Sequence, residues 1–432
     1  MGMKKMLGVV LSAGLLLVSA GIAFASEIDV LLEKLVDKGV LTPLEAQIIQ
    51  DETRQDVAKQ ISQGTMDTMP GWTQTIKLGG DLRLRFQTQD KESTKHARNR
   101  GRYRLRFGAT ANPVQDVEVG FRLASGSEDI GTSTNQSFDD SFGKDDIWID
   151  SAYLKYNPMS GVSLVAGKFD SKDYLWKTTD LIWDSDINPE GASINMTHGL
   201  TDHVDVFGNV GAWMIEEVAS TSTHATDPFL HYFQGGIKYS EEKYDAQLAG
   251  VYYGFNGIEN VALDKEGKWL SDSDLANQYY GLDTVTYTND FDSVGLSSEV
   301  GVNGIFGGLP WGMDQRIALF GDYIHNITNN VENDTGWMVG AKFGHAKVKD
   351  PSSWQVKYMY GELKQKAWPN LFTDSDRYSG NTNVKGHEWI WEYAWKKNVV
   401  FGLDYYNSDR LDRSLNAKDR EHLFQADVSV KF

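Results

Sequence analysis

The sequence alternates apolar and polar residues with a period of two over most of its length. The clearest case is residues 101–107, "GRYRLRF", in which three arginines alternate with Tyr103, Leu105 and Phe107. The stretch "DLRLRF", residues 81–86, repeats the pattern. Successive side chains of an extended strand point to opposite faces, so each stretch has one apolar face and one row of guanidinium groups. Such a strand needs an apolar medium on one side and water or counter-charge on the other.

About sixteen alternating stretches follow one another from residue 75 to the C-terminus. Short turns, such as those after the Asn-Pro pairs at 112–113 and 157–158, alternate with long polar connections such as 127–145. An even number of strands with this rhythm is typical of transmembrane barrels. About sixteen strands close into a tube too wide for side chains to fill, so we expect a wet inner face and not the packed core of a soluble β-sandwich. We therefore predict an all-β fold for residues 71–432: a transmembrane antiparallel β-barrel of about 16 strands.

The N-terminal region does not share this pattern. Lys4 and Lys5 precede an apolar run that ends in a small-x-small triplet at residues 23–25, which predicts a cleaved secretory signal peptide over residues 1–25. A retained membrane anchor is the alternative interpretation. Residues 26–70 carry apolar residues at helical spacing, with a stop at Gly39 and a new start at Thr42. We expect a helical periplasmic leader or stem there; a simple packed leader is the alternative.

The C-terminal stretch "ADVSVKF" is amphipathic and ends in an aromatic residue, Phe432. A closing strand of this kind resembles the assembly signal of Gram-negative outer-membrane barrels. It predicts a cell outer membrane location and the barrel-assembly machinery as a partner. Aromatic residues also gather near strand ends, as the interfacial girdles of membrane barrels require.

Composition narrows the possible partners. The formal net charge is −18, and it becomes −20 once Lys4 and Lys5 leave with residues 1–25, which contain no acidic residue. So acidic a chain argues against nucleic acid as a partner. The mean hydropathy is −0.42, and no apolar run after residue 25 is long enough for a transmembrane helix. The chain contains no cysteine, which fits an exported envelope protein without identifying one.

Several of these features together resemble one family. The signal peptide, the short helical leader, "GDLRLRF", "AYLKYNP", "VAGKF" and the terminal phenylalanine resemble the putative porin family of Gram-negative outer-membrane β-barrels. More distantly, they resemble the phosphate-selective porins. The resemblance implies a homotrimer of sixteen-stranded diffusion channels in outer-membrane lipid, which passes small hydrophilic solutes and ions.

The resemblance also implies a place for the pore constriction. In sixteen-stranded porins the third exterior loop folds into the barrel, and here that loop would be residues 170–190. An exposed acidic loop outside the barrel is the alternative. The acidic and basic residues that we expect there include Asp170, Lys172, Asp173, Asp180, Asp184 and Asp186. Facing them we expect a wall of arginines on the first three strands: Arg83, Arg85, Arg102, Arg104, Arg106 and Arg122.

The chemistry of this wall leaves three interpretations open. A charge on the lipid-facing side at the bilayer midplane costs about 2 to 4 kcal/mol, so these arginines should face water. A guanidinium row favours anions, but other inward candidates are acidic, and weak selectivity is equally consistent with the sequence. The arginines could also serve only as structural partners of the loop.

The remaining sequence features argue against other functions. We find no catalytic constellation, no cofactor-binding motif and no metal-ligand spacing, so we predict no enzyme, no cofactor and no metal. The Asp-rich stretches at 271–274 and 374–376 could bind Ca²⁺, but solvated loop charge explains them better. A structural barrel that tethers something through its leader is the main alternative to a channel. A barrel enzyme is a weaker one, because no residue pair for it is found at a rim.

Overall fold

The computed structural model describes residues 71–432 apart from 128–130, 140, 218–226, 259–261, 264–284, 287–289, 306–314 and 413–419. It also describes a few positions between residues 35 and 49. The predicted signal peptide and most of the predicted leader therefore lie outside the described residues. The chain divides into two units, residues 1–74 and 75–432, and each is described by itself.

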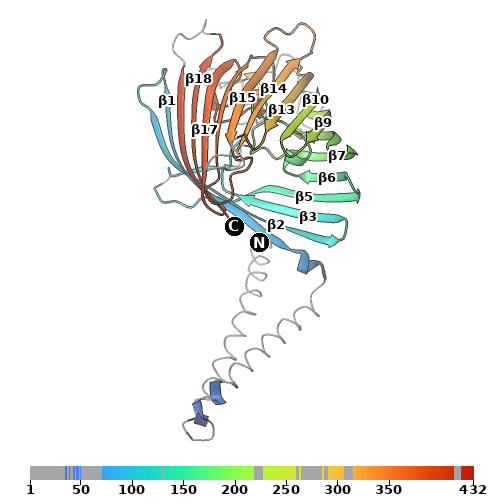
Figure 1. The fold of residues 1–432 in the computed structure, drawn as a ribbon. Coiled ribbons are helices and arrows are strands. Elements are labelled where there is room, and N and C mark those ends of the chain that lie inside the picture. Colours follow the sequence, from blue (N-terminus) through green and yellow to red (C-terminus); the bar gives the residue numbers. More distant parts are fainter. Residues whose placement is uncertain are drawn as a thin grey trace. The chain divides into compact units, whose positions relative to one another are not determined.

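The second unit is built almost entirely of strands (Figure 1). Sixteen of them are long: β1 (Lys77–Lys91), β2 (Arg98–Val114), β3 (Val117–Ala124), β5 (Trp148–Met159), β6 (Val162–Lys168), β7 (Glu190–Thr201), β8 (Val204–Met214), β9 (Phe229–Ser240), β10 (Tyr244–Asn256), β13 (Ser293–Val302), β14 (Arg316–Asn326), β15 (Thr335–Gly344), β16 (Trp354–Leu363), β17 (Val384–Lys396), β18 (Val399–Arg410) and β19 (Glu421–Lys431). The short elements are β4 (Gln136–Ser137), β11 (Ala262–Leu263), β12 (Val285–Thr286) and the 3-10 helices η1 (Gly71–Thr75), η2 (Ser171–Asp173), η3 (Asn370–Phe372) and η4 (Tyr378–Gly380).

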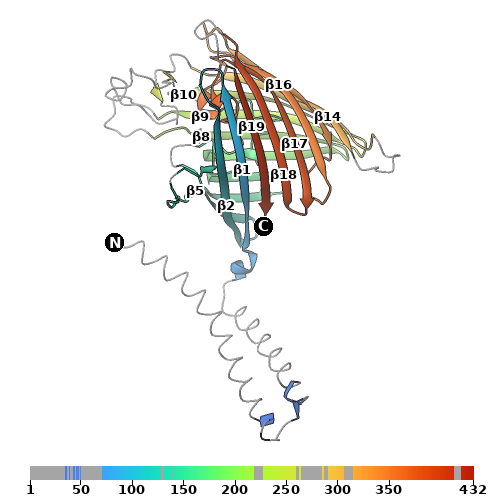
Figure 2. The same ribbon diagram turned by 90° about the vertical axis from the view of Figure 1, so that its left-hand side faces the viewer.

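The long strands form one closed antiparallel barrel, as predicted. Each pairs with its neighbours along the chain, and the last strand, β19, pairs with β1 from Asp81↔Lys431 to Lys91↔Glu421. Figure 2 shows β19 lying beside β1. Phe432 completes the seam, because its backbone exchanges hydrogen bonds of 2.9 and 3.0 Å with Gly80. Strand β4 pairs with β2 beyond the point where the short strand β3 ends.

The two ends of the barrel differ. At the end where β1 begins and β19 finishes, turns such as 115–116, 160–161 and 397–398 join the strands. At the opposite end, which we call the loop end, the connections are mostly long, and they include 125–147, 169–189 and 364–383. This is the rhythm that the sequence predicts, with the two Asn-Pro pairs lying just before the first two turns.

The alternation of side chains defines an outer and an inner face. On β1, Leu84 and Phe86 are 50% and 52% exposed, whereas Arg85 between them is only 7% exposed. Apolar side chains cover the outer face on the other strands too, for example Phe107 on β2 and Leu319 on β14. The arginines of β1 and β2 therefore lie on the inner face, and all except the exposed Arg98 are covered at least in part by other parts of the chain.

The inner face is not wet throughout, which corrects our expectation. From β8 to β16 many inward residues are aromatic or aliphatic, and they form an apolar cluster with residues of the connections 169–189 and 364–383. Its members include Trp183, Trp213, Tyr232, Tyr253, Phe320, Met338 and Trp368. The physical reason is that a tube too wide for side chains alone is filled in part by its own loops. We call this part of the interior the apolar side.

The few described residues of the first unit include a helix start. The backbone N–H of Thr42 donates to the Glu45 carboxylate (2.9 Å), and the N–H of Glu45 donates to the Thr42 hydroxyl (3.3 Å). This reciprocal pair is a capping box, and it lies where the sequence predicts a new helix. No helix among the described residues has both the length and the apolar character needed to cross a bilayer.

Candidate functional site

The arginine row occupies adjacent positions on β1 and β2. The register places Arg83 opposite Arg104 and Arg85 opposite Arg102. Like charges directly opposite each other destabilise a sheet, so each arginine needs a nearby counter-charge. The carboxylates around the row show how the barrel meets this need.

Asp81 neutralises the part of the row nearest the turn end. One carboxylate oxygen accepts from Arg104 (2.8 and 3.0 Å) and the other accepts from Arg106 (2.7 Å). Asp186, from connection 169–189, lies 3.7 Å from Arg104 and 3.6 Å from Arg106. Two arginines thus face one carboxylate of the wall and one of the loop.

Arg83 and Arg85 face different partners. Arg85 makes a two-pronged contact with Asp427 of β19, with both distances 2.8 Å, and donates to Asp376 of connection 364–383 at 2.9 Å. Arg83 donates to the Asn135 amide oxygen (2.7 Å) and lies 3.9 Å from Asp427. The paired, bidentate geometry is the strong form of the guanidinium–carboxylate contact.

Of the two remaining predicted arginines, only Arg122 contacts connection 169–189 among the described residues. Arg122 pairs with Asp150 of β5 and donates to Asn188 of the loop (3.3 Å). Arg102 contacts only neutral acceptors among the described residues: Gln87, Ser133 and the Asn135 carbonyl, at 3.3 to 3.5 Å.

Connection 169–189 is bound to the inner face of strands far apart around the barrel. The N–H of Thr179 donates to Asp322 of β14 (2.6 Å), and the N–H of Trp176 donates to Gln234 of β9 (2.8 Å). Asp186 of the same connection reaches the arginines of β2. Strands β2 and β14 lie on separate parts of the ring, so this connection spans the interior between them.

The predicted loop residues do not all lie together. Asp184 and Asp186 face the second inner connection and the arginine row, whereas the others lie apart from the arginines. Asp170 pairs with Lys172 (3.2 Å), both well exposed, and Asp173 lies 3.9 Å from Lys155. Asp180 pairs with Lys177 of the same loop.

Connection 364–383 is the part of the site that sequence reasoning missed. It enters the interior as well, and it docks on loop 169–189: the Asp184 N–H donates to the Phe372 carbonyl (2.7 Å), and the Ser375 N–H donates to the Asp184 carboxylate (2.9 Å). We interpreted its stretch 374–376 as solvated loop charge, but Asp376 binds Arg85 and Arg377 pairs with Glu388 of β17. The available signal was "AWPNLF", an aromatic and apolar run inside an otherwise polar connection.

Burial shifts the acidity of the carboxyls where these two connections meet. Burial, and then the neighbouring Asp186, raise the pKa of Asp184 to about 8. Burial and the charge of Asp184 also raise the pKa of Asp374 well above its usual range. Burial acts in the same direction on Asp376, but Arg85 outweighs it and holds the pKa of Asp376 below its usual value. No group of three or more residues suited to bind a metal occurs in the described part of the chain.

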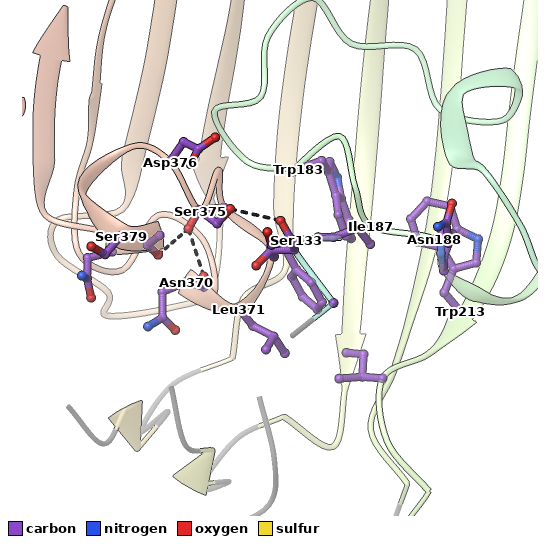
Figure 3. Close-up of a pocket in the computed structure, with 18 of the residues that line it drawn as sticks. Ser133, Trp183, Ile187, Asn188, Trp213, Asn370, Leu371, Ser375, Asp376 and Ser379 are labelled. Atoms are coloured by element: carbon purple, nitrogen blue, oxygen red, sulfur yellow. Dashed lines mark hydrogen bonds between the residues drawn. The ribbon is translucent and has the colours of Figure 1, made fainter. Parts of the chain in front are cut away.

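A cavity of about 680 Å³ opens above the two connections, toward the loop end. Figure 3 shows Trp183 and Ile187 on one side of it, with Asp376, Ser375 and Ser379 on the other. Three arginines of β2 complete its lining: Arg98, Arg100 and Arg102. We call this cavity the vestibule.

The sequence also matches a family of known proteins. Residues 88–280 and 291–432, most of the barrel, match the model of a family described as putative porin. The chain belongs to the putative porin family. This porin is therefore a β-barrel of the outer membrane, and its family and fold are those of a channel rather than an enzyme.

Solved structures resemble this porin in fold. OprB of Pseudomonas putida, in its high-pH structure, has a TM-score of 0.53 at 10% identity, over 83% of this chain and 95% of that chain. Two mutants of the Rhodopseudomonas blastica porin have TM-scores of 0.43 at 11% and 12% identity, over 83% of this chain and 100% of those chains. No curated protein matches the sequence of this porin.

Proposed function

We propose that this porin forms a water-filled pore for the passive diffusion of small hydrophilic solutes and ions, narrowed where the arginine wall faces acidic residues of its inner connections. The observation that carries the proposal is the position of Asp186, 3.6 and 3.7 Å from Arg106 and Arg104. The apolar side of the interior is packed, so the wet passage runs along the strands that bear the arginines.

Charge of opposite sign on facing walls produces an electric field across the passage. Polar solutes align their dipoles in this field, whereas apolar solutes lose hydration without compensation. Rings and rows of charge also set the ion preference of a pore. Because Arg83, Arg85, Arg104 and Arg106 each lie within ion-pair distance of a carboxylate, we expect weak ion selectivity at the constriction.

The loop end of the barrel faces the cell exterior in this proposal, and the chain termini of the barrel face the periplasm. The long connections at one end and short turns at the other support this orientation. Cleavage of residues 1–25, delivery by the barrel-assembly machinery through Phe432, a periplasmic role for residues 26–70 and assembly as a homotrimer belong to the same proposal.

Single-channel recording in a planar bilayer tests this function. We expect stepwise conductance, with a reversal potential close to zero in a salt gradient. Asp186→Asn removes the carboxylate that faces two arginines and should shift the reversal potential toward anion preference. Folded protein without any conductance would contradict the pore and favour a structural barrel.

Asp170→Asn is the matched control for this variant. It makes the same change of charge in the same connection, but at a residue whose side chain bonds to Lys172 alone among the described residues. We expect its reversal potential to equal that of the unmodified protein. An equal shift in both variants would mean that the constriction is not at Asp186.

A further inference from the structure

The vestibule differs from the constriction in the state of its arginines. At the constriction Arg85, Arg104 and Arg106 are each paired with a carboxylate. Arg98, Arg100 and Arg102 have no carboxylate within the 4 Å of an ion pair in the described part of the chain. The Nε atoms of Arg100 and Arg102 are buried and have no hydrogen-bond partner there. Unpartnered guanidinium donors are costly, and these arginines line one cavity in which an anion would supply the missing counter-charge.

The carboxylates that line the vestibule compensate these arginines only in part: Asp376 attracts Arg100 and Arg102 from beyond ion-pair distance. Asp376 is held by Arg85 at 2.9 Å, and Glu190 is held by Lys168 at 2.8 Å. Glu216 and Glu217 line the cavity as well, next in sequence to Ile215 and close to Trp213. They disfavour a second negative charge on a ligand at that position.

The wall away from the arginines is apolar. Trp183 and Trp213 pack edge to face with centroids 5.3 Å apart, and Ile187 and Leu371 line the cavity beside them. Aromatic faces and aliphatic side chains favour a ring or a hydrocarbon body. A volume of about 680 Å³ is in the range of pockets that bind small organic molecules.

We infer that the vestibule binds organic monocarboxylates with an aromatic or alicyclic body, the carboxylate at Arg100 and Arg102 and the body against the Trp183–Trp213 wall. This inference rests on the proposed function, because it makes the vestibule the entry subsite of the pore. A subsite of this kind would make the channel prefer one class of solute, whereas general diffusion needs no preferred solute. One carboxylate spans the donors of neighbouring arginines, since residues two apart on a strand lie about 7 Å apart.

Block of single-channel current by benzoate, added on the loop side, is the main test. Benzamide and acetate are the matched probes, because the first keeps the ring without the charge and the second keeps the charge without the ring. We expect benzoate to block at a concentration about tenfold lower than either probe. One charge-assisted hydrogen bond accounts for the difference from benzamide, and burial of the ring accounts for the difference from acetate. Equal block by benzoate and acetate would overturn the inference.

Two variants assign the subsite. Arg100→Gln with Arg102→Gln should weaken the block by benzoate about tenfold or more. Ile187→Asn with Leu371→Asn should weaken the block by benzoate and leave that by acetate unchanged. The control, Lys95→Gln with Lys144→Gln, removes the same charge at exposed residues outside the vestibule and should behave as the unmodified protein. An arginine variant with unchanged block would refute the assignment.

A binding measurement separates failure of the inference from failure of the pore. Benzoate binding to the folded full-length protein in detergent can be followed by calorimetry and by tryptophan fluorescence, since Trp183 and Trp213 line the vestibule. Protein that binds benzoate through Arg100 and Arg102 but conducts no current would support the subsite and contradict the pore. Protein that conducts but does not bind benzoate would support the pore and contradict the subsite.

Discussion

Arg104 and Arg106 show how an arginine row is tolerated inside a strand pair. Both form ion pairs with Asp81, which lies on the neighbouring strand directly opposite Arg106. The sheet supplies one carboxylate for two guanidinium groups. The positive charge that is left over is faced by the Asp186 carboxylate. These contacts make both arginines structural partners of the sheet and of connection 169–189. In our proposal they also contribute to the field across the passage, so a structural role and a role in the pore are compatible.

The double variant Arg104→Gln with Arg106→Gln should shift ion selectivity toward cations. It removes two positive charges and leaves Asp81 and Asp186 uncompensated beside the passage. The reversal potential in a salt gradient measures the shift. Lys95→Gln with Lys144→Gln is matched in charge, and a shift of equal size there would indicate a general effect of net charge. Heat-modified migration on a gel establishes that both variants are folded.

At the scale of elements, two connections hold each other inside the barrel. Connection 169–189 is bound to strands β9 and β14, and connection 364–383 is bound to it through Asp184 and to the wall through Asp376 and Arg377. Trp368 of the second connection is fully buried against Trp183 of the first, with centroids 5.4 Å apart. Each connection is therefore held both by the wall and by the other connection.

The docking of these two connections should weaken as pH rises from about 4 to about 8. Asp184, with its pKa raised to about 8, and Asp374, with its pKa also raised, hold protons in the docked state that they lose in water near pH 4. The docked state therefore binds more protons across this window, and its stability falls as pH increases. The facing groups are Asp180, Asp186, Asp376, Glu388 and Arg377.

Mean conductance and its fluctuation between pH 4 and pH 8 measure this effect. We expect both to increase with pH, because undocked connections widen the passage. Asp184→Asn with Asp374→Asn should remove the dependence, since neither amide titrates, while Asp170→Asn should retain it. Asp376, whose pKa is lowered, acts only below about pH 4, the ordinary value of an aspartate. Conductance that falls with rising pH would contradict the mechanism.

At the scale of the molecule, Phe432 takes part in the seam that closes the barrel. The Phe432 backbone makes two hydrogen bonds to Gly80, and its ring occupies the space beside that glycine. A Cβ on Gly80 would lie 2.9 Å from the ring and 2.3 Å from the Arg106 carbonyl, so a side chain does not fit there.

Deletion of Phe432 should lower the yield of closed barrel, because the seam between β1 and β19 loses its final pair. The heat-modifiable band of membrane fractions measures the folded share. Phe432→Trp keeps a terminal aromatic residue and the backbone bonds, and we expect it to retain more closed barrel than the deletion. Equal yields from deletion and unmodified chain would show that closure does not need this residue.

The sequence predicts the wall of this molecule better than its contents. Alternation identifies all sixteen long strands, because side chains that face lipid must be apolar. Residues such as Leu84 and Phe107 also show which face of each strand points outward. The docked connections were only partly predicted. The inward Tyr232 and Phe320 look like exceptions to alternation until their loop partners are known. The contact between Asp184 and Ser375 joins residues 191 positions apart, a pairing that local patterns do not encode.

The apolar side of the interior has a consequence for amphiphiles. If both connections withdrew, one side of the open lumen would be apolar. It would be lined by Trp213, Tyr232, Tyr253 and Phe320. The apolar parts of detergents or bile acids could leave water by binding to this surface, as they do in a micelle. With the connections in place, this flank is occupied by the chain's own tryptophans. If the proposed pore is correct, the two connections would therefore have a second effect besides narrowing it: they would keep amphiphiles away from the apolar side of the interior.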